Sequence, residues 1–203
     1  NIGAEGQLLM GAWAASAIVL LPVVPAGTPA IVTIPLMMVA AMLAGGVLVV
    51  SALAPYKRLV DALEASSRLG LPLTIAGFGP EERRLRALAG PSVRFAGSPS
   101  DEELRDLYRA AAVVLMPGEE DFGIVPLEAQ ACGTPVVALG KGGALETVAD
   151  GVTGILYPEA GPGPLAGAIG RALSTSFDAG ALVANARRFS EPAFRAQFLA
   201  AAR

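Results

Sequence analysis

Two carboxylates, Glu120 and Glu128, flank an expected helix start and are the side chains of this chain best placed to do chemistry. The segment 117–135 (PGEEDFGIVPLEAQACGTP) follows an apolar run, turns through glycine and acidic residues, and enters a short helix that ends at Gly133. The free N–H groups and the dipole of a helix start attract anions. The segment therefore indicates a site for a polar, phosphorylated ligand.

The elements that would position this loop are alternating strands and helices. Six short apolar runs lack a polar–apolar alternation, which is typical of strands covered on both faces. They are Val47–Leu53, Leu73–Ala76, Val93–Ala96, Ala112–Met116, Val136–Leu139 and Gly154–Tyr157. Helical patterns between them predict an α/β fold with a doubly wound parallel sheet, in which ligands bind at the carboxyl ends of the strands.

Two of the expected helical regions carry specific signals. The helix over 101–111 has its apolar residues on one face, and Ser100 and Glu103 form a capping box at its start. The tail, 164–203, is expected to form two or three helices that pack against the domain. Its apolar anchors are Phe189, Phe194 and Phe198.

Charged residues are distributed unevenly along the 203 residues. From Gly6 to Tyr56 there is no Asp, Glu, Lys or Arg, whereas all 15 Lys and Arg lie from Lys57 onward with 17 of the 18 acidic residues. This break predicts two unlike pieces, 1–46 and 47–203. The second piece is near neutral, so it lacks the basic surface that binds nucleic acid.

The chain has one cysteine, Cys132, and no histidine. A single cysteine excludes an internal disulfide framework and is typical of a reducing compartment. Without histidine or a second cysteine, a protein-held zinc or copper site is not expected, and histidine is excluded as a general base. We therefore expect no metal cofactor.

The first piece contains two apolar runs of 18 residues, 7–24 and 29–46. Each is long enough to cross roughly 30 Å of hydrocarbon as a helix, which predicts a transmembrane helical hairpin over 1–46. A buried hairpin in a soluble core is the alternative. Lys57 and Arg58 would place the second piece at the cytoplasmic face of the membrane.

Common nucleotide-binding fingerprints are absent from the sequence. Gly77-Phe78-Gly79 is followed by Pro80, so no G-x-G-x-x-G is formed, and Lys141 is followed by glycine instead of Ser or Thr. Dehydrogenases and P-loop nucleotide hydrolases are therefore not indicated. No D-x-D triplet signals a metal clamp on a diphosphate.

Several motifs of the second piece follow one another in a family-specific order. They are 49–61 (VVSALAPYKRLVD), 75–81 (IAGFGPE), 93–97 (VRFAG), the E-x(7)-E pair Glu120 and Glu128, and 142–148 (GGALETV). This order and spacing resembles the donor-binding domain of family 4 glycosyltransferases, retaining enzymes with the two-domain GT-B fold, and their mannosyltransferase-like subgroup in particular. The resemblance runs from about 47 to 190.

The resemblance implies a nucleotide-diphosphate sugar as the ligand, with GDP-mannose among the donors. Lys57 would meet the diphosphate as a point charge. Backbone N–H groups at the expected helix start would receive phosphate or sugar oxygens, aided by the helix dipole. These belong to Gly123, Ile124 and Val125.

The remaining ligand groups are also assigned by the resemblance. Glu120 would hydrogen-bond hydroxyls of the sugar, and Glu128 those of the ribose. Gly97 and Ser98 would contact the base through their backbone. The sugar would be transferred, with retention of its anomeric configuration, to a glycan or a lipid-linked acceptor held by a second domain.

Two departures from the family pattern bear on activity. Ala52 stands where the family usually carries an arginine five residues before the lysine. The acceptor-binding domain, which would precede residue 47, is replaced by the apolar piece. Because positioning both substrates supplies a large part of catalysis, we expect donor binding with little or no turnover.

Two other interpretations stay open. Residues 1–12 (NIGAEGQLLMGA) resemble a segment of sugar or nucleoside ABC-transporter permeases, which would make the chain a membrane transport component. Alternatively, the junction near Gly46 is an artefact of gene prediction or sequence assembly, and the two pieces form a chimera.

Overall fold

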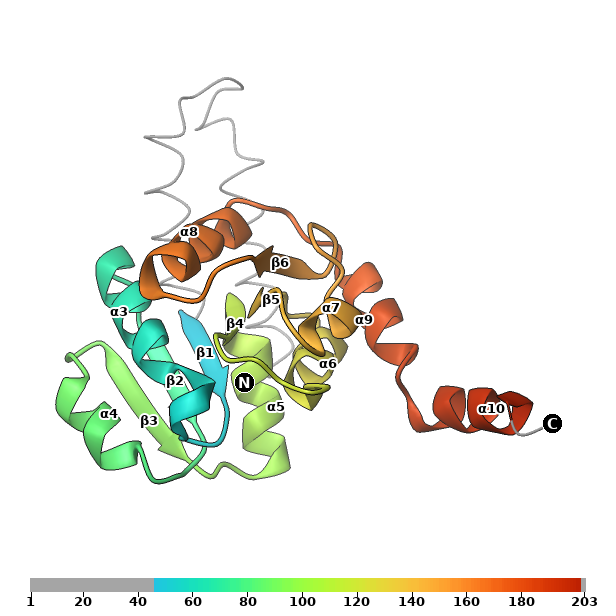
Figure 1. The fold of residues 1–203 in the computed structure, drawn as a ribbon, viewed down its shortest axis with the longest axis horizontal. Helices are drawn as coiled ribbons and strands as arrows, with labels where there is room; N and C mark the ends of the chain where they lie inside the picture. The colour runs from blue at the N-terminus through green and yellow to red at the C-terminus, as the bar shows by residue number, and fades with distance from the viewer. Residues whose placement is uncertain (1–45, 202–203) are drawn as a thin grey trace, which may run out of the picture.

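A computed structural model of the chain describes residues 46–201, and these residues form a six-stranded parallel sheet with helices on both faces (Figure 1). The strand order is β3-β2-β1-β4-β5-β6. The strands are β1 (Val47–Val50), β2 (Leu73–Ala76), β3 (Val93–Gly97), β4 (Val113–Met116), β5 (Val136–Leu139) and β6 (Gly154–Tyr157). The predicted Rossmann-like, doubly wound parallel sheet is confirmed.

The helices alternate with the strands and then continue as a helical tail. They are η1 (Pro55–Lys57), α3 (Leu59–Leu69), α4 (Glu82–Leu88), α5 (Asp101–Ala110), α6 (Ile124–Ala131), α7 (Ala144–Thr147), α8 (Pro162–Leu173), α9 (Ala179–Arg187) and α10 (Glu191–Ala201). β1 ends at Val50, short of the expected Leu53. Residues 51–53 leave the regular ladder as the chain opens toward η1, although Leu53 still donates to the Phe78 carbonyl at 3.0 Å.

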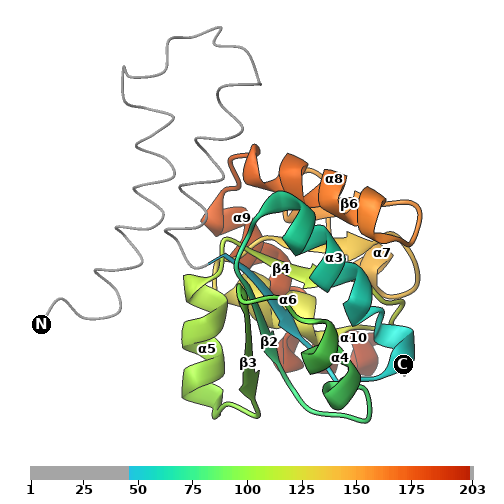
Figure 2. The same cartoon turned by 90° about the vertical axis from the view of Figure 1, so that its left-hand side faces the viewer.

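The sheet is buried because each of its faces packs against helices (Figure 2). Val47 and Val49 face the cluster that contains α3, α4 and α8, whereas Leu48 between them faces the cluster of α5, α6 and α7. Neighbouring residues of β4 and β5 divide in the same way. Apolar residues are therefore needed at every position of β1, β4 and β5, which explains why the sequence lacks alternation there.

The capping box predicted at the start of α5 is present. The Ser100 hydroxyl accepts from the Glu103 N–H at 3.3 Å, and the Glu103 carboxylate accepts from the Ser100 N–H at 2.8 Å. The hydrogen bond from the Ser100 backbone also lowers the pKa of Glu103. These bonds fix the start of α5 and therefore the register of its apolar face.

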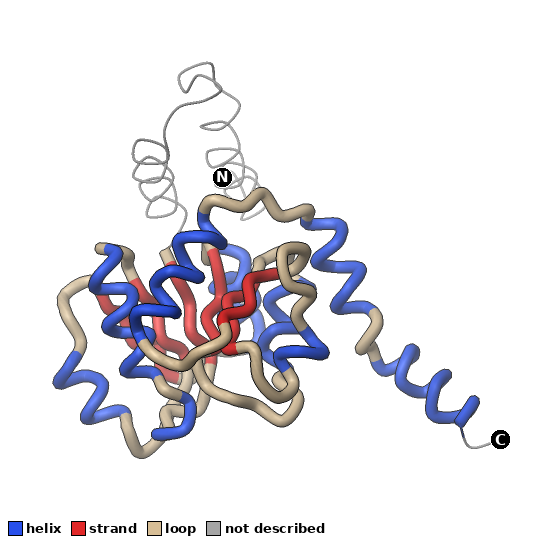
Figure 3. Tube along the Cα trace, turned by 45° about the horizontal axis from the view of Figure 1, so that its top comes forward, coloured by secondary structure: helices blue, strands red, loops and turns tan. Residues whose placement is uncertain are grey.

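The predicted helical tail is present, but its packing against the domain is only partly as expected. α8 packs on α3 and α9 packs on α6, whereas α10 extends away from the domain (Figure 3). The side chains of Phe194 and Phe198 are 65% and 62% exposed and contact each other at 6.0 Å between ring centroids. The expectation that they anchor the tail is wrong, because α9 already covers the adjoining surface of α6 and α10 begins beyond it.

The predictions for the apolar runs lie outside the described residues. The hairpin over 1–46, its membrane association and the permease-like segment rest on residues 1–45. Within 46–201, none of the helices has the length and apolar character needed to span a bilayer.

Two glycine substitutions test how closely β5 and β6 approach. A Cβ at Gly154 would lie 2.1 Å from the Val136 carbonyl oxygen, whereas one at Gly167, exposed in α8, would meet nothing within 4 Å. Gly154→Ala should lower the free energy of unfolding by about 1–3 kcal/mol, and Gly167→Ala should raise it by about 0.5–1 kcal/mol. Urea denaturation measures both, and a stability gain at Gly154 would contradict the packing described.

Candidate functional site

A cavity of about 380 Å³ lies at the carboxyl ends of β1 and β4. It is lined by residues 49–52, by Lys57, and by most of the segment 115–125. The chain runs from β1 to β2 and β3 on one side, then returns to place β4, β5 and β6 on the other. The cavity therefore occupies the point where the strand order reverses, which is where ligands bind to sheets of this kind.

An ion pair joins Lys57 Nζ to the Glu120 carboxylate on one wall of this cavity. The two side chains are 12% and 23% exposed and come from η1 and from the loop between β4 and α6. The ammonium group also lies 4.8 Å from the centre of the Tyr56 ring. A cation and an acceptor-only carboxylate side by side can bind a phosphate oxygen and a hydroxyl group of one ligand.

The start of α6 forms a second part of the cavity wall. Gly123 precedes the helix with a φ of +80°, a conformation that favours glycine, and no side chain caps the helix. Gly123, Ile124 and Val125 line the cavity. Because the first N–H groups of a helix lack partners within it, they can bind an anion here.

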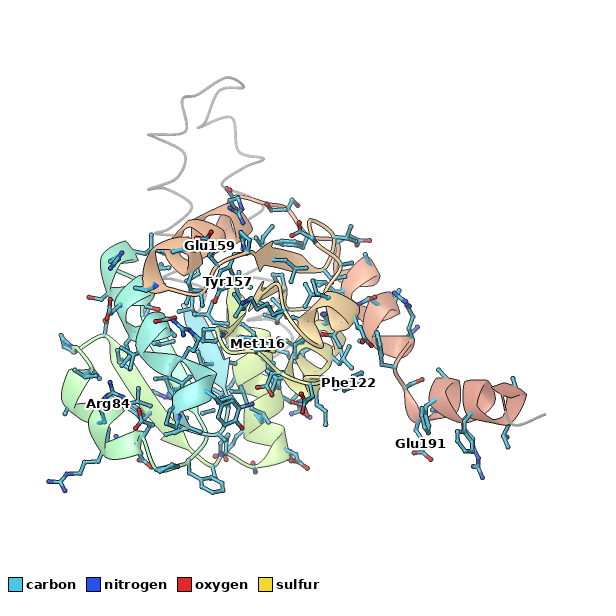
Figure 4. All side chains as sticks on the ribbon, in the orientation of Figure 1. Arg84, Met116, Phe122, Tyr157, Glu159 and Glu191 are labelled. Atoms are coloured by element: carbon cyan, nitrogen blue, oxygen red, sulfur yellow. The ribbon has the colours of Figure 1, made fainter. Side chains whose placement is uncertain are left out.

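Glycines let neighbouring backbone segments approach the loop that carries Glu120. A Cβ at Gly118 would lie 2.7 Å from the Tyr56 carbonyl oxygen, and a Cβ at Gly143 would lie 2.2 Å from that of Phe122. The Gly143 N–H also donates to the Glu120 carbonyl at 2.7 Å. Figure 4 shows the loop between the interior, at Met116, and the surface, at Phe122.

These supporting glycines were missed as site residues in the sequence. Gly142 and Gly143 stand out only as a motif after a strand. The sequence feature that could have identified them is the pair of consecutive glycines after a strand. Such a pair at the carboxyl edge of the sheet indicates that another backbone segment passes close by.

Five predicted site residues therefore meet at one cavity: Lys57, Glu120, Gly123, Ile124 and Val125. Glu128, Gly97 and Ser98 do not line it. Gly97 ends β3, two strands away from β1, and its carbonyl accepts from the Gly77 N–H at 2.6 Å. Glu128 lies one turn along α6, and its carboxylate accepts from the Tyr108 hydroxyl at 2.7 Å.

Ala52 lines the cavity, so the arginine expected from the family pattern has no counterpart there. Among the described residues that line it, Lys57 is the one cation. Arg58 does not replace the arginine, because its guanidinium pairs with Asp61 at 2.8 Å and lines a separate, smaller depression.

Comparison with known families matches residues 46–189 to the family described as glycosyl transferases group 1. The chain belongs to this family. This match confirms that the motifs of residues 47–190 are those of a glycosyltransferase. The permease-like segment and the mannosyltransferase specificity find no support in the comparisons.

Curated relatives match over parts of their length. The chain is 45% identical over 118 residues to the D-inositol 3-phosphate glycosyltransferase of Acidothermus cellulolyticus, covering 54% of this chain and 26% of the relative. It is 57% identical over 67 residues to the D-inositol 3-phosphate glycosyltransferase of Kribbella flavida, and the match covers 32% of this chain and 16% of the relative. The chain thus spans about a quarter or less of these relatives.

Solved structures share the fold over about half their length. Anabaena HepE in complex with UDP has a TM-score of 0.67 and 27% identity, covering 76% of this chain and 48% of HepE. Sucrose-phosphate synthase from Thermosynechococcus elongatus has a TM-score of 0.60 and 32% identity, covering 71% and 40%. These neighbours confirm the Rossmann-like fold of one half of a GT-B enzyme.

Removing the lysine of the ion pair tests its burial. Lys57→Met should lower the free energy of unfolding by about 1–3 kcal/mol, because Glu120 would stay desolvated without its partner. The control is Arg68→Met, whose pair with Glu64 spans 3.5 Å and is more than half exposed, and which should change stability by less than about 0.5 kcal/mol. Urea denaturation measures both variants. Equal losses of stability in Lys57→Met and Arg68→Met would contradict the conclusion that the pair of Lys57 and Glu120 is desolvated.

Proposed function

We propose that this chain contains the donor site of a glycosyltransferase and binds a nucleotide-diphosphate sugar in the cavity between β1 and β4. The observation that carries the proposal is the convergence of Lys57, Glu120 and the uncapped start of α6 on one cavity at the reversal of strand order. Membership of the glycosyltransferase family supports the same ligand class.

The charges of the site suit the bond that such an enzyme breaks. Cleaving a sugar–diphosphate bond develops negative charge on the departing phosphate, which Lys57 and the N–H groups of α6 would stabilise. Glu120 would accept hydrogen bonds from sugar hydroxyls. The diphosphate would draw Lys57 away from Glu120, so binding exchanges one ion pair for another. This arrangement requires no metal ion.

The other predicted contacts extend the ligand from the cavity. The ribose hydroxyls would meet Glu128, one turn beyond the cavity on α6, and the base would lie toward Gly97 and Ser98 at the end of β3. Uridine is the favoured base, because HepE has been solved with UDP and with UDP and glucose at 27% and 26% identity to this chain. GDP-mannose is the competing donor.

The acceptor would be held by a second domain facing this edge of the sheet. The family resemblance suggests a glycan or a lipid-linked acceptor. The names of the curated relatives suggest D-inositol 3-phosphate as an alternative acceptor. We propose that transfer by residues 46–201 alone is weak, since they match about half the length of the solved neighbour HepE. We also propose that the site faces the cytoplasm.

The alternative function, a membrane transport component, has no comparable support within residues 46–201.

Titration calorimetry of the full chain with UDP-glucose, UDP and GDP-mannose tests this function. Lys57→Ala should weaken UDP and UDP-glucose alike by about 10- to 100-fold, because a hydrogen bond to a charged group is lost. Arg68→Ala should leave every affinity unchanged, because Arg68 lies at the far end of α3, toward the amino edge of the sheet.

A second substitution locates the sugar. Glu120→Ala should weaken UDP-glucose by about 10-fold or more and leave UDP affinity unchanged or improved, since only the sugar loses an acceptor and Lys57 is released. Failure of the wild-type chain to bind any of the three nucleotides would overturn the proposed function. Indifference of UDP-glucose to Glu120→Ala would overturn the assigned role of Glu120.

A further inference from the structure

A buried tyrosine on α5 contacts the second carboxylate of the E-x(7)-E pair. Tyr108 is 2% exposed, and its hydroxyl donates to Glu128 Oε2 at 2.7 Å. At the other end of the residue, the Thr134 hydroxyl donates to the Tyr108 carbonyl at 2.6 Å. Tyr108 is therefore held rigidly, and its hydroxyl defines a fixed point near α6.

Glu128 is exposed, so without this bond its side chain would be free to sample several rotamers. The bond uses one carboxylate oxygen, and no described residue donates to the other, Oε1. Tyr108 thus selects one arrangement of the Glu128 carboxylate and leaves Oε1 as a strong acceptor. An acceptor fixed in advance binds a ligand hydroxyl at a lower entropic cost than a mobile one.

The geometry of α6 directs that free acceptor toward the cavity. Ile124 and Val125 line the cavity and lie four and three residues before Glu128, so the three share one face of the helix. Side chains of a helix lean toward its N-terminus, which here is the cavity wall. Glu128 therefore follows the cavity wall by one turn on the same face of α6, where a ligand that extends from the cavity along the helix would meet it.

We propose that Tyr108 is a positioning residue that holds Glu128 for hydrogen bonding to the two ribose hydroxyls of the nucleotide. The inference rests on the proposed function, because it requires a nucleotide in the cavity. Burial, with a smaller contribution from Glu128, raises the pKa of Tyr108, so its hydroxyl remains protonated and a donor throughout the range in which the protein is handled. The bond does not depend on pH near neutrality.

A purely structural role is the competing explanation. A buried phenol hydroxyl needs a partner, and Glu128 satisfies it whether or not a ligand binds. The two explanations differ in one measurable respect. A structural role affects every ligand through the fold, whereas a positioning role affects only ligands that carry ribose hydroxyls.

The test is calorimetry of the full chain and of Tyr108→Phe with two ligands, UDP and 2′,3′-dideoxy-UDP. Tyr108→Phe keeps the ring and removes only the hydroxyl. UDP affinity should fall by about 5- to 10-fold, while affinity for the dideoxy analogue should stay within about 2-fold. Glu128→Gln should show the same selectivity for UDP.

A matched control removes a different buried hydroxyl. Tyr157 is 1% exposed and packs in the cluster on the opposite face of the sheet, and its hydroxyl donates to the Pro117 carbonyl at 3.5 Å instead of to Glu128. Because Pro117 lines the cavity, Tyr157→Phe can change the affinity for both ligands but should not discriminate between them. Circular dichroism and urea denaturation of each variant establish that the fold persists and give the loss of stability separately from the loss of affinity.

The possible outcomes separate the two proposals. Equal losses for UDP and the dideoxy analogue in Tyr108→Phe, or no loss for either, would overturn the positioning role. If Glu128→Gln selectively weakens UDP but Tyr108→Phe does not, the ribose contact stands and only the role of Tyr108 falls. If the wild-type chain binds no nucleotide, the proposed function and this inference fall together.

Discussion

The site depends on how closely three backbone segments approach one another at the carboxyl edge of the sheet. The loop between β4 and α6 passes η1 at Gly118 and the turn after β5 at Gly143, with no room for a side chain at either point. Close-packed backbone cannot move without a cost in energy. This constraint brings Lys57 and Glu120, 63 residues apart, to one wall of the cavity.

The charge of that wall is balanced before any ligand binds. Of the described residues lining the cavity, only Lys57 and Glu120 are charged, and they neutralise each other. Isolated pairs of this kind add little to stability when their desolvation is counted. With alanine at position 52, an anionic ligand has one cation and the start of α6 to bind to. In the proposed donor complex, the helix terminus would therefore carry a larger share of anion binding than in a site with two cationic side chains.

A buried polar network explains why α9 packs on the domain while α10 does not. Asn185 of α9 donates to the side chain of Gln130 at 2.6 Å, and Gln130 donates to the Thr147 carbonyl at 2.8 Å. Thr147 in turn donates to the Gly143 carbonyl at 2.8 Å. Because buried polar groups require partners, these bonds fix α9 against α6 and α7 and support the turn beside Glu120. In α10, by contrast, Phe194, Phe198 and Leu199 are exposed.

The sequence by itself determined the sheet, the start of α5 and the loop at 117–123. Apolar runs of four to seven residues without alternation indicate strands buried on both faces, and a capping box defines a helix start by local hydrogen bonds. Tertiary structure alone decided that Glu120 pairs with Lys57 and that Glu128 pairs with Tyr108. It also decided that α10 leaves the domain. Local patterns encode which face of an element is buried, whereas partners distant in sequence are chosen by the way elements pack, and no periodicity records that choice.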